Sequence, residues 1–191
     1  GRSQAGEVYI VFGGSTWSFP FDLAFLNATQ GVKIQGASAG DNLGTSISIV
    51  SDMNGDSRLD LILSAYQADP LGRSGAGIVY LLFGRSSWPA IIDLSNITQS
   101  EATIIYGASV GDNLGSLIIE VSDMNGDGKS DLLLSAYAAS PLNRTYAGIV
   151  YLLFGEAIVS ISSSSSSSSS LPSSNVNSNS IFISIDFTIV S

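Results

Sequence analysis

The sequence predicts an all-β protein built from repeated units of equal length. Short apolar runs separated by glycine, asparagine, aspartate and proline recur along the chain, and no segment has the 3.6-residue period of an amphipathic helix. The apolar run 8–12 returns at 79–83 and 150–154, and the glycines that close these runs are evenly spaced, since 84 − 13 = 71 and 155 − 84 = 71. Residues 36–84 and 107–155 are identical at 35 of 49 positions. Such a period is typical of units that bury their faces against neighbouring copies.

The composition agrees with a chain rich in buried strands and excludes several functions. Of the 191 residues, 45% are hydrophobic and 12% are charged, and the net charge is −9. No apolar run approaches the roughly 18 residues that a membrane span needs, and the seven lysines and arginines are too scattered to predict a nucleic-acid partner. The chain contains neither cysteine nor histidine, which removes disulfides, the usual zinc ligands and the common catalytic triads. We therefore expect that the protein is not an enzyme.

Within one unit we expect four strands, near 45–50, 59–65, 77–83 and 103–107. The run from 78 to 83 is apolar at every position, which predicts a central strand covered on both faces. The strand at 45–50 alternates serine with isoleucine, so it should be half-exposed.

Each unit carries an aspartate-rich loop between its first two expected strands. The pattern Asp-x-Asn-x-Asp-x-x-x-Asp occupies 52–60 and returns at 123–131. Oxygen side chains at positions 1, 3, 5 and 9, with a backbone carbonyl at position 7, are the ligands that Ca²⁺ needs to collect six or more oxygens. The sequence therefore predicts two calcium sites, formed by Asp52, Asn54, Asp56, the Arg58 carbonyl and Asp60, and by Asp123, Asn125, Asp127, the Lys129 carbonyl and Asp131.

Two other interpretations of these loops are weaker. An EF-hand would need a glutamate at position 12 and a helix after it, but position 12 is Leu63 or Leu134, inside an apolar run that predicts a strand. A plain turn would also use aspartate, asparagine and glycine. All four side-chain ligands recur at identical spacing while their neighbours at 57–59 and 128–130 differ, and this favours the metal site.

The order of these motifs resembles the FG-GAP repeat found in the propellers of integrin α-subunits. The resemblance covers residues 6–155 and rests on Gly-Asp-Asn-Leu-Gly at 40–44, the calcium motif, and Val-Tyr-x-x-Phe-Gly at 79–84. Leu43 and Leu114 stand where the family often has phenylalanine, and Ser-Ala-Tyr replaces Gly-Ala-Pro after the second strand. Membership implies β-propeller blades of four antiparallel strands, with the calcium loop joining the first two strands of a blade.

We divide the chain into five parts: a half repeat that ends a preceding unit (1–35), an FG-GAP-like repeat with its calcium loop (36–106), a second, incomplete repeat with its loop (107–155), a linker rich in serine and asparagine (156–180), and a C-terminal strand (181–191). Propellers usually need four to eight blades, so we expect an incomplete propeller in one chain. Because the sequence begins at glycine without a signal-like apolar stretch, we expect a processed product or a piece of something longer. The incomplete set of blades leaves open strand edges, so either the chain is cut from a longer array or other copies complete its edges.

The C-terminal strand belongs to none of the repeated units. Apolar side chains occupy every odd position from 181 to 189, which predicts a strand with one apolar face. Addition of this strand to an incomplete sheet edge is the use that we expect. The 25 residues between 155 and 181 span at most about 80–90 Å, so the strand can join a neighbouring copy or fold back onto its own chain.

Glycosylation signals complete the prediction. The sequons at Asn27, Asn96 and Asn143 predict N-linked sugar, and the serine tract within 162–174 predicts either O-linked sugar or a flexible linker. We therefore expect an extracellular or cell-surface structural protein that self-associates into a fibre or surface assembly. The alternative is an adhesion or ligand-binding module cut from a longer integrin-like propeller.

Overall fold

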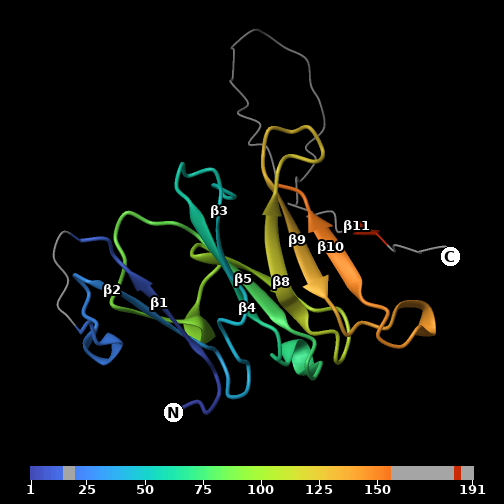
Figure 1. Ribbon diagram of the computed structural model, residues 1–191, viewed down its shortest axis with the longest axis horizontal. Helices are drawn as coiled ribbons and strands as arrows, with labels where there is room; N and C mark the ends of the chain where they lie inside the picture. The colour runs from blue at the N-terminus through green and yellow to red at the C-terminus, as the bar shows by residue number, and fades with distance from the viewer. Residues whose placement is uncertain (15–19, 156–182, 186–191) are drawn as a thin grey trace, which may run out of the picture.

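The strands of the computed structural model are all short. The structure describes residues 1–14, 20–155 and, for the backbone alone, 183–185. The strands are β1 (Glu7–Val11), β2 (Gly31–Gln35), β3 (Ile47–Val50), β4 (Asp60–Ala65), β5 (Ile78–Leu82), β6 (Ile91–Asp93), β7 (Ala102–Tyr106), β8 (Leu114–Val121), β9 (Asp131–Ala136), β10 (Ile149–Leu153) and β11 (Ile183–Ile185) (Figure 1). Single turns of 3-10 helix form η1 (Leu23–Phe25), η2 (Pro70–Gly72), η3 (Leu94–Asn96) and η4 (Pro141–Asn143).

The strands form three sheets. The first sheet has the order β1-β2-β6, the second β3-β4-β5-β7 and the third β8-β9-β10-β11. All pairs are antiparallel except β2 with β6, which run parallel. Adding 71 to each residue number converts β1 and β2 into β5 and β7, and β4 and β5 into β9 and β10. The predicted all-β fold is therefore confirmed, and the sequence period is also the period of the structure.

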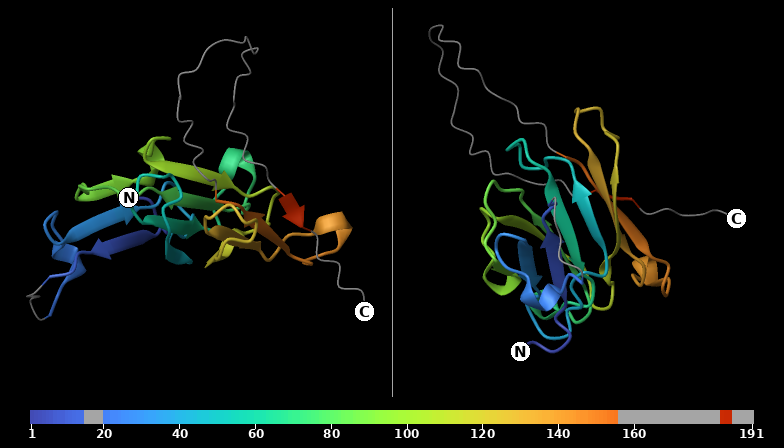
Figure 2. Two further views of the ribbon diagram at one scale, coloured as in Figure 1. Left: turned by 90° about the horizontal axis from the view of Figure 1, so that it is seen from above. Right: turned by 60° about the vertical axis from the view of Figure 1, so that its left-hand side comes forward.

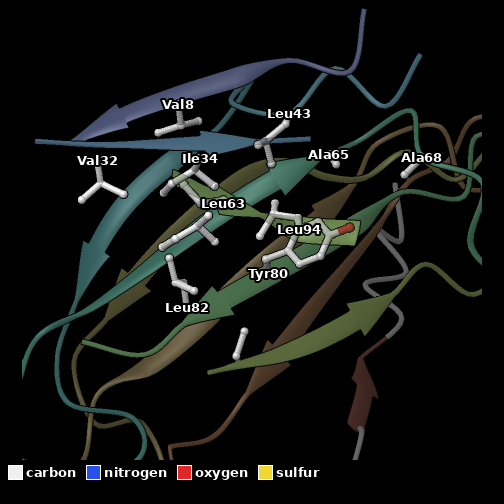
Figure 3. Packing of buried hydrophobic residues seen from close by; sticks show 12 residues of the cluster. Val8, Val32, Ile34, Leu43, Leu63, Ala65, Ala68, Tyr80, Leu82 and Leu94 are labelled. Atoms are coloured by element: carbon white, nitrogen blue, oxygen red, sulfur yellow. The ribbon is translucent and has the colours of Figure 1, made fainter. Parts of the chain in front are cut away.

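Two buried clusters lie between the three sheets, which follow one another across the molecule (Figure 2). The first cluster joins the first and second sheets, and Figure 3 shows Val8, Val32 and Ile34 with Leu63, Tyr80 and Leu82. The second cluster joins the second and third sheets through residues such as Ile62, Val79, Leu132 and Leu134. Strand β5 supplies Tyr80 and Leu82 to the first cluster and Val79 and Leu81 to the second, which confirms the central strand covered on both faces.

Strand β3 is half-exposed, as its alternation predicts, but its apolar side faces outward. The side chains of Ile47 and Ile49 are 47% and 66% exposed. On the other face the Ser46 hydroxyl accepts a hydrogen bond from the Ile118 amide of the third sheet, 3.1 Å away. Serine is small enough to allow this close approach of a neighbouring backbone, so packing between sheets decides the orientation of β3.

Two features of the strands differ from the expected pattern. Strand β6, which adds a third strand to the first sheet, was not expected from the sequence. Strand β8 begins at Leu114, earlier than its counterpart β3, and its pairing with β9 shifts between Leu114 and Leu117. A bulge of this kind bends a strand locally, and it has no sequence signal apart from its glycine.

No helix in the described ranges is long and apolar enough to cross a membrane.

Part of the predicted C-terminal strand is present as β11. It pairs antiparallel with β10 of the same chain, with Val150 opposite Ile185. It therefore takes the place on β10 that β7 takes on β5. The remainder of the predicted strand, and the linker at 156–180 with its serine tract, lie outside the described residues.

Candidate metal centre

The two aspartate-rich loops occupy equivalent places in the second and third sheets. The first loop (51–59) connects β3 to β4, and the second loop (122–130) connects β8 to β9. Both loops lie at the upper end of their sheets in Figure 1. The sequence thus placed these loops correctly between the first two strands of each unit, with a strand rather than a helix after each.

The first aspartate of each loop organises the turn. The Asp52 carboxylate accepts hydrogen bonds from the backbone amides of Gly55 at 2.6 Å, Asp56 at 3.1 Å and Ser57 at 2.7 Å. Asp123 accepts the same three bonds from the second loop, at 2.6, 3.1 and 2.7 Å. Burial is the largest single influence on the pKa of Asp52 and raises it. The amide donors act in the opposite direction, and the pKa is lowered overall. The pKa of Asp123 is lowered chiefly by the Gly128 amide, so both carboxylates favour the charged form.

The last aspartate of each loop is buried and ties the loop to the sheet. Asp60 accepts from the Met53 amide at 2.9 Å and from the Gly84 amide, just after β5, at 2.8 Å. Asp131 repeats this arrangement through the equivalent amides, at 2.7 and 3.0 Å. The two side chains are 1% and 0% exposed. Burial raises the pKa of Asp60, and the nearby charges of Asp56 and Asp52 raise it further.

The middle ligands are exposed, except for the half-buried Asp127, and they hold only local bonds. The Asn54 carbonyl oxygen accepts from the Asp56 amide at 3.1 Å, and Asp56 in turn accepts from the Arg58 amide at 2.9 Å. The second loop repeats both contacts at 3.2 and 2.8 Å, with Asn125, Asp127 and Lys129 in the same roles. Each loop therefore has oxygen-bearing side chains that solvent can reach.

The backbone of each loop uses the left-handed region at matching positions. Gly55 and Gly126 both have φ +83°. Position 6 of the loop is Gly128 at φ +85° in the second loop but Ser57 at φ +66° in the first. A residue with a side chain costs about 1–2 kcal/mol in that conformation, so the first loop holds strain that the second loop lacks.

The oxygen atoms of these loops suit a hard cation in kind and in charge. Within the described part of the chain, no group of three or more aspartates, glutamates, histidines or cysteines converges on one point that could hold a metal. The carboxylates of Asp52 and Asp60 bond instead to backbone amides. After burial, the nearby charges of Asp56 and Asp52 also raise the pKa of Asp60, so the three carboxylates of the first loop lie close enough to influence one another. Such a donor set fits Ca²⁺ better than any softer metal.

The sequence did not predict that the two loops touch. The Lys129 ammonium lies 3.5 Å from the Asp52 carbonyl oxygen, and its charge contributes to the low pKa of Asp52. The Ser51 amide donates to Glu120 of β8 at 3.0 Å, and the Ser51 and Ser130 hydroxyls are 3.4 Å apart. Only the stacking of sheets brings these residues together, so no local pattern could have indicated it.

The three N-glycosylation sequons are at the surface. Asn27, Asn96 and Asn143 are all exposed. The Asn27 side-chain carbonyl accepts from the Thr29 amide at 3.0 Å and from the Thr29 hydroxyl at 2.6 Å. The serines proposed to carry O-linked sugar lie outside the described residues.

Comparison with known proteins identifies the repeats. The FG-GAP repeat profile matches residues 43–82 and 118–153, each of which runs from the first strand of a sheet through its aspartate-rich loop to the third strand. The two matched segments are therefore FG-GAP repeats.

Relatives with curated descriptions share a longer stretch. The chain is 33% identical over 113 residues to phosphatidylinositol-glycan-specific phospholipase D of Bos taurus, 31% to that of Homo sapiens and 30% to that of Rattus norvegicus. The match covers 59% of this chain and 13% of each relative. The chain thus spans a small part of those proteins.

Proposed function

We propose that the chain is a calcium-stabilised, glycosylated extracellular module that serves as a structural subunit of a fibre or surface assembly. The observation that carries the calcium part is the identical hydrogen-bond scaffold of the two loops, in which Asp52 and Asp123 each accept three loop amides. An extracellular place is typical of FG-GAP repeats and agrees with the exposed sequons. Bound Ca²⁺ would supply positive charge to loops that gather three carboxylates each; the side chains of Asp52, Asn54, Asp56 and Asp60, with the Arg58 carbonyl, would hold it in the first loop.

Removal of calcium is expected to lower the melting temperature. An ion held at 100 times its dissociation constant stabilises the folded state by about 2.7 kcal/mol per site, which corresponds to several degrees for a chain of this size. Thermal unfolding in Ca²⁺, in Mg²⁺ and in EDTA measures the effect. Equal melting temperatures in Ca²⁺ and EDTA would refute calcium stabilisation.

Glycosylation is expected to raise the mass of the protein above that of the bare 19.8 kDa chain. Intact-mass analysis of protein secreted from a glycosylating host, before and after enzymatic removal of N-linked sugar, separates the two kinds of sugar. Replacement of Asn27 and Asn96 by glutamine should remove most of the N-linked mass, because these two sequons lie in equivalent long connections, β1 to β2 and β5 to β7. A secreted product with the bare mass would contradict the prediction.

Assembly is proposed to occur by exchange of the C-terminal strand. In the structure β11 lies on β10 of its own chain, and the same edge on a neighbouring copy offers identical backbone groups. Exchange between copies in one direction builds open filaments. Deletion of residues 176–191 should therefore abolish filaments in electron micrographs while leaving the calcium loops able to bind. Filaments that persist after this deletion would exclude exchange.

The alternative is an adhesion module, and one observation favours it. Leu71 and Leu142 lie on the equivalent turns η2 and η4 and are 78% and 72% exposed. Both have positive φ, +54° and +53°, which projects an apolar side chain from each turn. Discrete particles rather than filaments in electron micrographs, together with binding that is lost when both leucines become serine, would support adhesion.

A further inference from the structure

Arg73 is an arginine without the partner that its counterpart has. Arg2, its equivalent in the preceding unit, donates to both carboxylate oxygens of Asp93 at 2.6 and 2.9 Å, and to the Ser95 hydroxyl and the Gly36 carbonyl at 2.8 Å each. Arg73 donates only to the Ala108 carbonyl, at 3.3 Å, and its Nε is buried with no hydrogen-bond partner. Among the described residues it forms no ion pair. A buried donor left unpaired costs roughly 1–3 kcal/mol, and a carboxylate is the partner that the equivalent guanidinium of Arg2 has.

The sheet edge beside Arg73 also lacks a partner strand in the described part of the chain. In the first sheet β6 lies parallel on the outer edge of β2, which places Asp93 opposite Gln35 and within reach of Arg2. Strand β7 is the counterpart of β2 in the second sheet, and it is the last strand of that sheet. No strand covers its other edge in the described part of the chain. The place that β6 fills on β2 is thus free on β7.

An apolar crevice between the second and third sheets is the third feature of this site. Leu94 follows β6 and is 3% exposed, buried in the cluster between the first and second sheets. The corresponding space between the second and third sheets is an apolar crevice of about 230 Å³. Its lining includes Leu114, Leu134 and Tyr151, the equivalents of Leu43, Leu63 and Tyr80, which lie with Leu94 in the first cluster. The crevice is therefore the position in which a counterpart of Leu94 would be buried.

The C-terminal segment carries the sequence that this position requires. Ile92-Asp93-Leu94-Ser95 recurs as Ile185-Asp186-Phe187-Thr188, with an apolar, an acidic, an apolar and a hydroxyl residue in the same order. The offset is 186 − 93 = 93 instead of 71, and the stretch rich in serine and asparagine that precedes the segment accounts for the greater separation. Residues 186–188 lie outside the described ranges.

We propose that residues 184–188 dock parallel to β7, with the Asp186 carboxylate on Arg73 and the Phe187 ring in the crevice. Docking would give the terminal nitrogens of Arg73 the carboxylate partner that Arg2 has in Asp93, and it would cover apolar surface of Ile105 and Tyr151. The structure has Ile183–Ile185 on β10, so the segment would have two exclusive positions, and Arg73 selects the one on β7. The inference refines the proposed role of the C-terminal strand in assembly, but it does not depend on exchange between copies.

Disulfide trapping distinguishes the two positions, because the chain has no cysteine of its own. The pairing of Lys33 with Ile91 translates into Ile104 opposite Ser184 on β7, whereas the structure has Tyr151 opposite Ser184 on β10. The full chain would carry either Ile104→Cys with Ser184→Cys or Tyr151→Cys with Ser184→Cys. The measured quantity is the ratio of the two initial rates of disulfide formation, 104–184 over 151–184.

The ratio is expected to favour β7 and to fall at least tenfold when Arg73→Ala is added. Asp186→Asn should lower it similarly without altering the arginine, and Arg73→Asp combined with Asp186→Arg should restore it. The matched control is Arg144→Ala, the same position one unit later, which should leave the ratio unchanged. A ratio that is the same with and without Arg73 would overturn the docking position. Cross-linked monomers would place the segment in its own chain and cross-linked dimers in a second copy; dimers alone agree with exchange.

Discussion

Replacement of Asp60 by alanine is expected to destabilise the protein by about 3–5 kcal/mol, even in EDTA. The Asp60 side chain is buried and accepts hydrogen bonds from the backbone amides of Met53 and Gly84, and alanine can accept neither. Each buried amide left without a partner costs about 1–3 kcal/mol, and the loop loses its tie to the end of β5. Denaturant unfolding in EDTA measures the loss without any contribution from a metal.

Asp56→Ala is the matched control in the same loop. Asp56 is a proposed calcium ligand like Asp60, but it is exposed and accepts one local amide, from Arg58. In EDTA its loss should cost less than about 1 kcal/mol, as is usual at the surface. In Ca²⁺ both variants should lose the metal-dependent gain in stability. Equal costs for the two variants in EDTA would show that the buried carboxylate has no structural role of its own.

The sequence alone does not separate the two roles of the loop, the binding of a cation and the bonding of backbone amides. The spacing of Asp52, Asn54, Asp56 and Asp60 predicted a single task, the binding of a cation. The structure adds that the first and last aspartates bond to loop and sheet amides. A pattern of oxygen side chains is the same for both tasks, so only the hydrogen-bond geometry reveals the second.

The fold was predictable wherever the pattern was local or repeated. The apolar run of β5 predicted a strand covered on both sides, and the period of the sequence predicted equivalent strands. Strand β6 was missed because three residues between a proline and a 3-10 turn give no periodicity. The pairing of Arg2 with Asp93 joins residues 91 positions apart and depends on the addition of β6 to the edge of β2 within the first sheet. Such contacts have no signal in a single sequence.

The sequence also did not predict how closely the backbones of neighbouring units approach each other at Gly77. A substitution at this position is expected to have the second large effect on stability. Gly77, just before β5, has φ +88°. A Cβ there would lie 2.4 Å from the Leu114 carbonyl oxygen and 2.6 Å from the Leu114 amide nitrogen. The Leu114 amide donates to Ala76 at 2.9 Å, so this backbone contact holds the third sheet to the second. The glycine is needed both for its conformation and for the absence of a side chain.

Gly77→Ala is therefore expected to destabilise the protein by roughly 2–5 kcal/mol. About 1–2 kcal/mol comes from the left-handed backbone and a further 1–3 from a clash with backbone that cannot move aside. Gly148→Ala is the matched control, because Gly148 has φ +78° but its Cβ would meet nothing closer than the Tyr137 carbonyl oxygen at 3.5 Å. It should lose only the conformational part. Thermal unfolding of the two variants in the same Ca²⁺ buffer gives the difference, and melting temperatures within a degree of each other would show that the contact with Leu114 does not hold the sheets together.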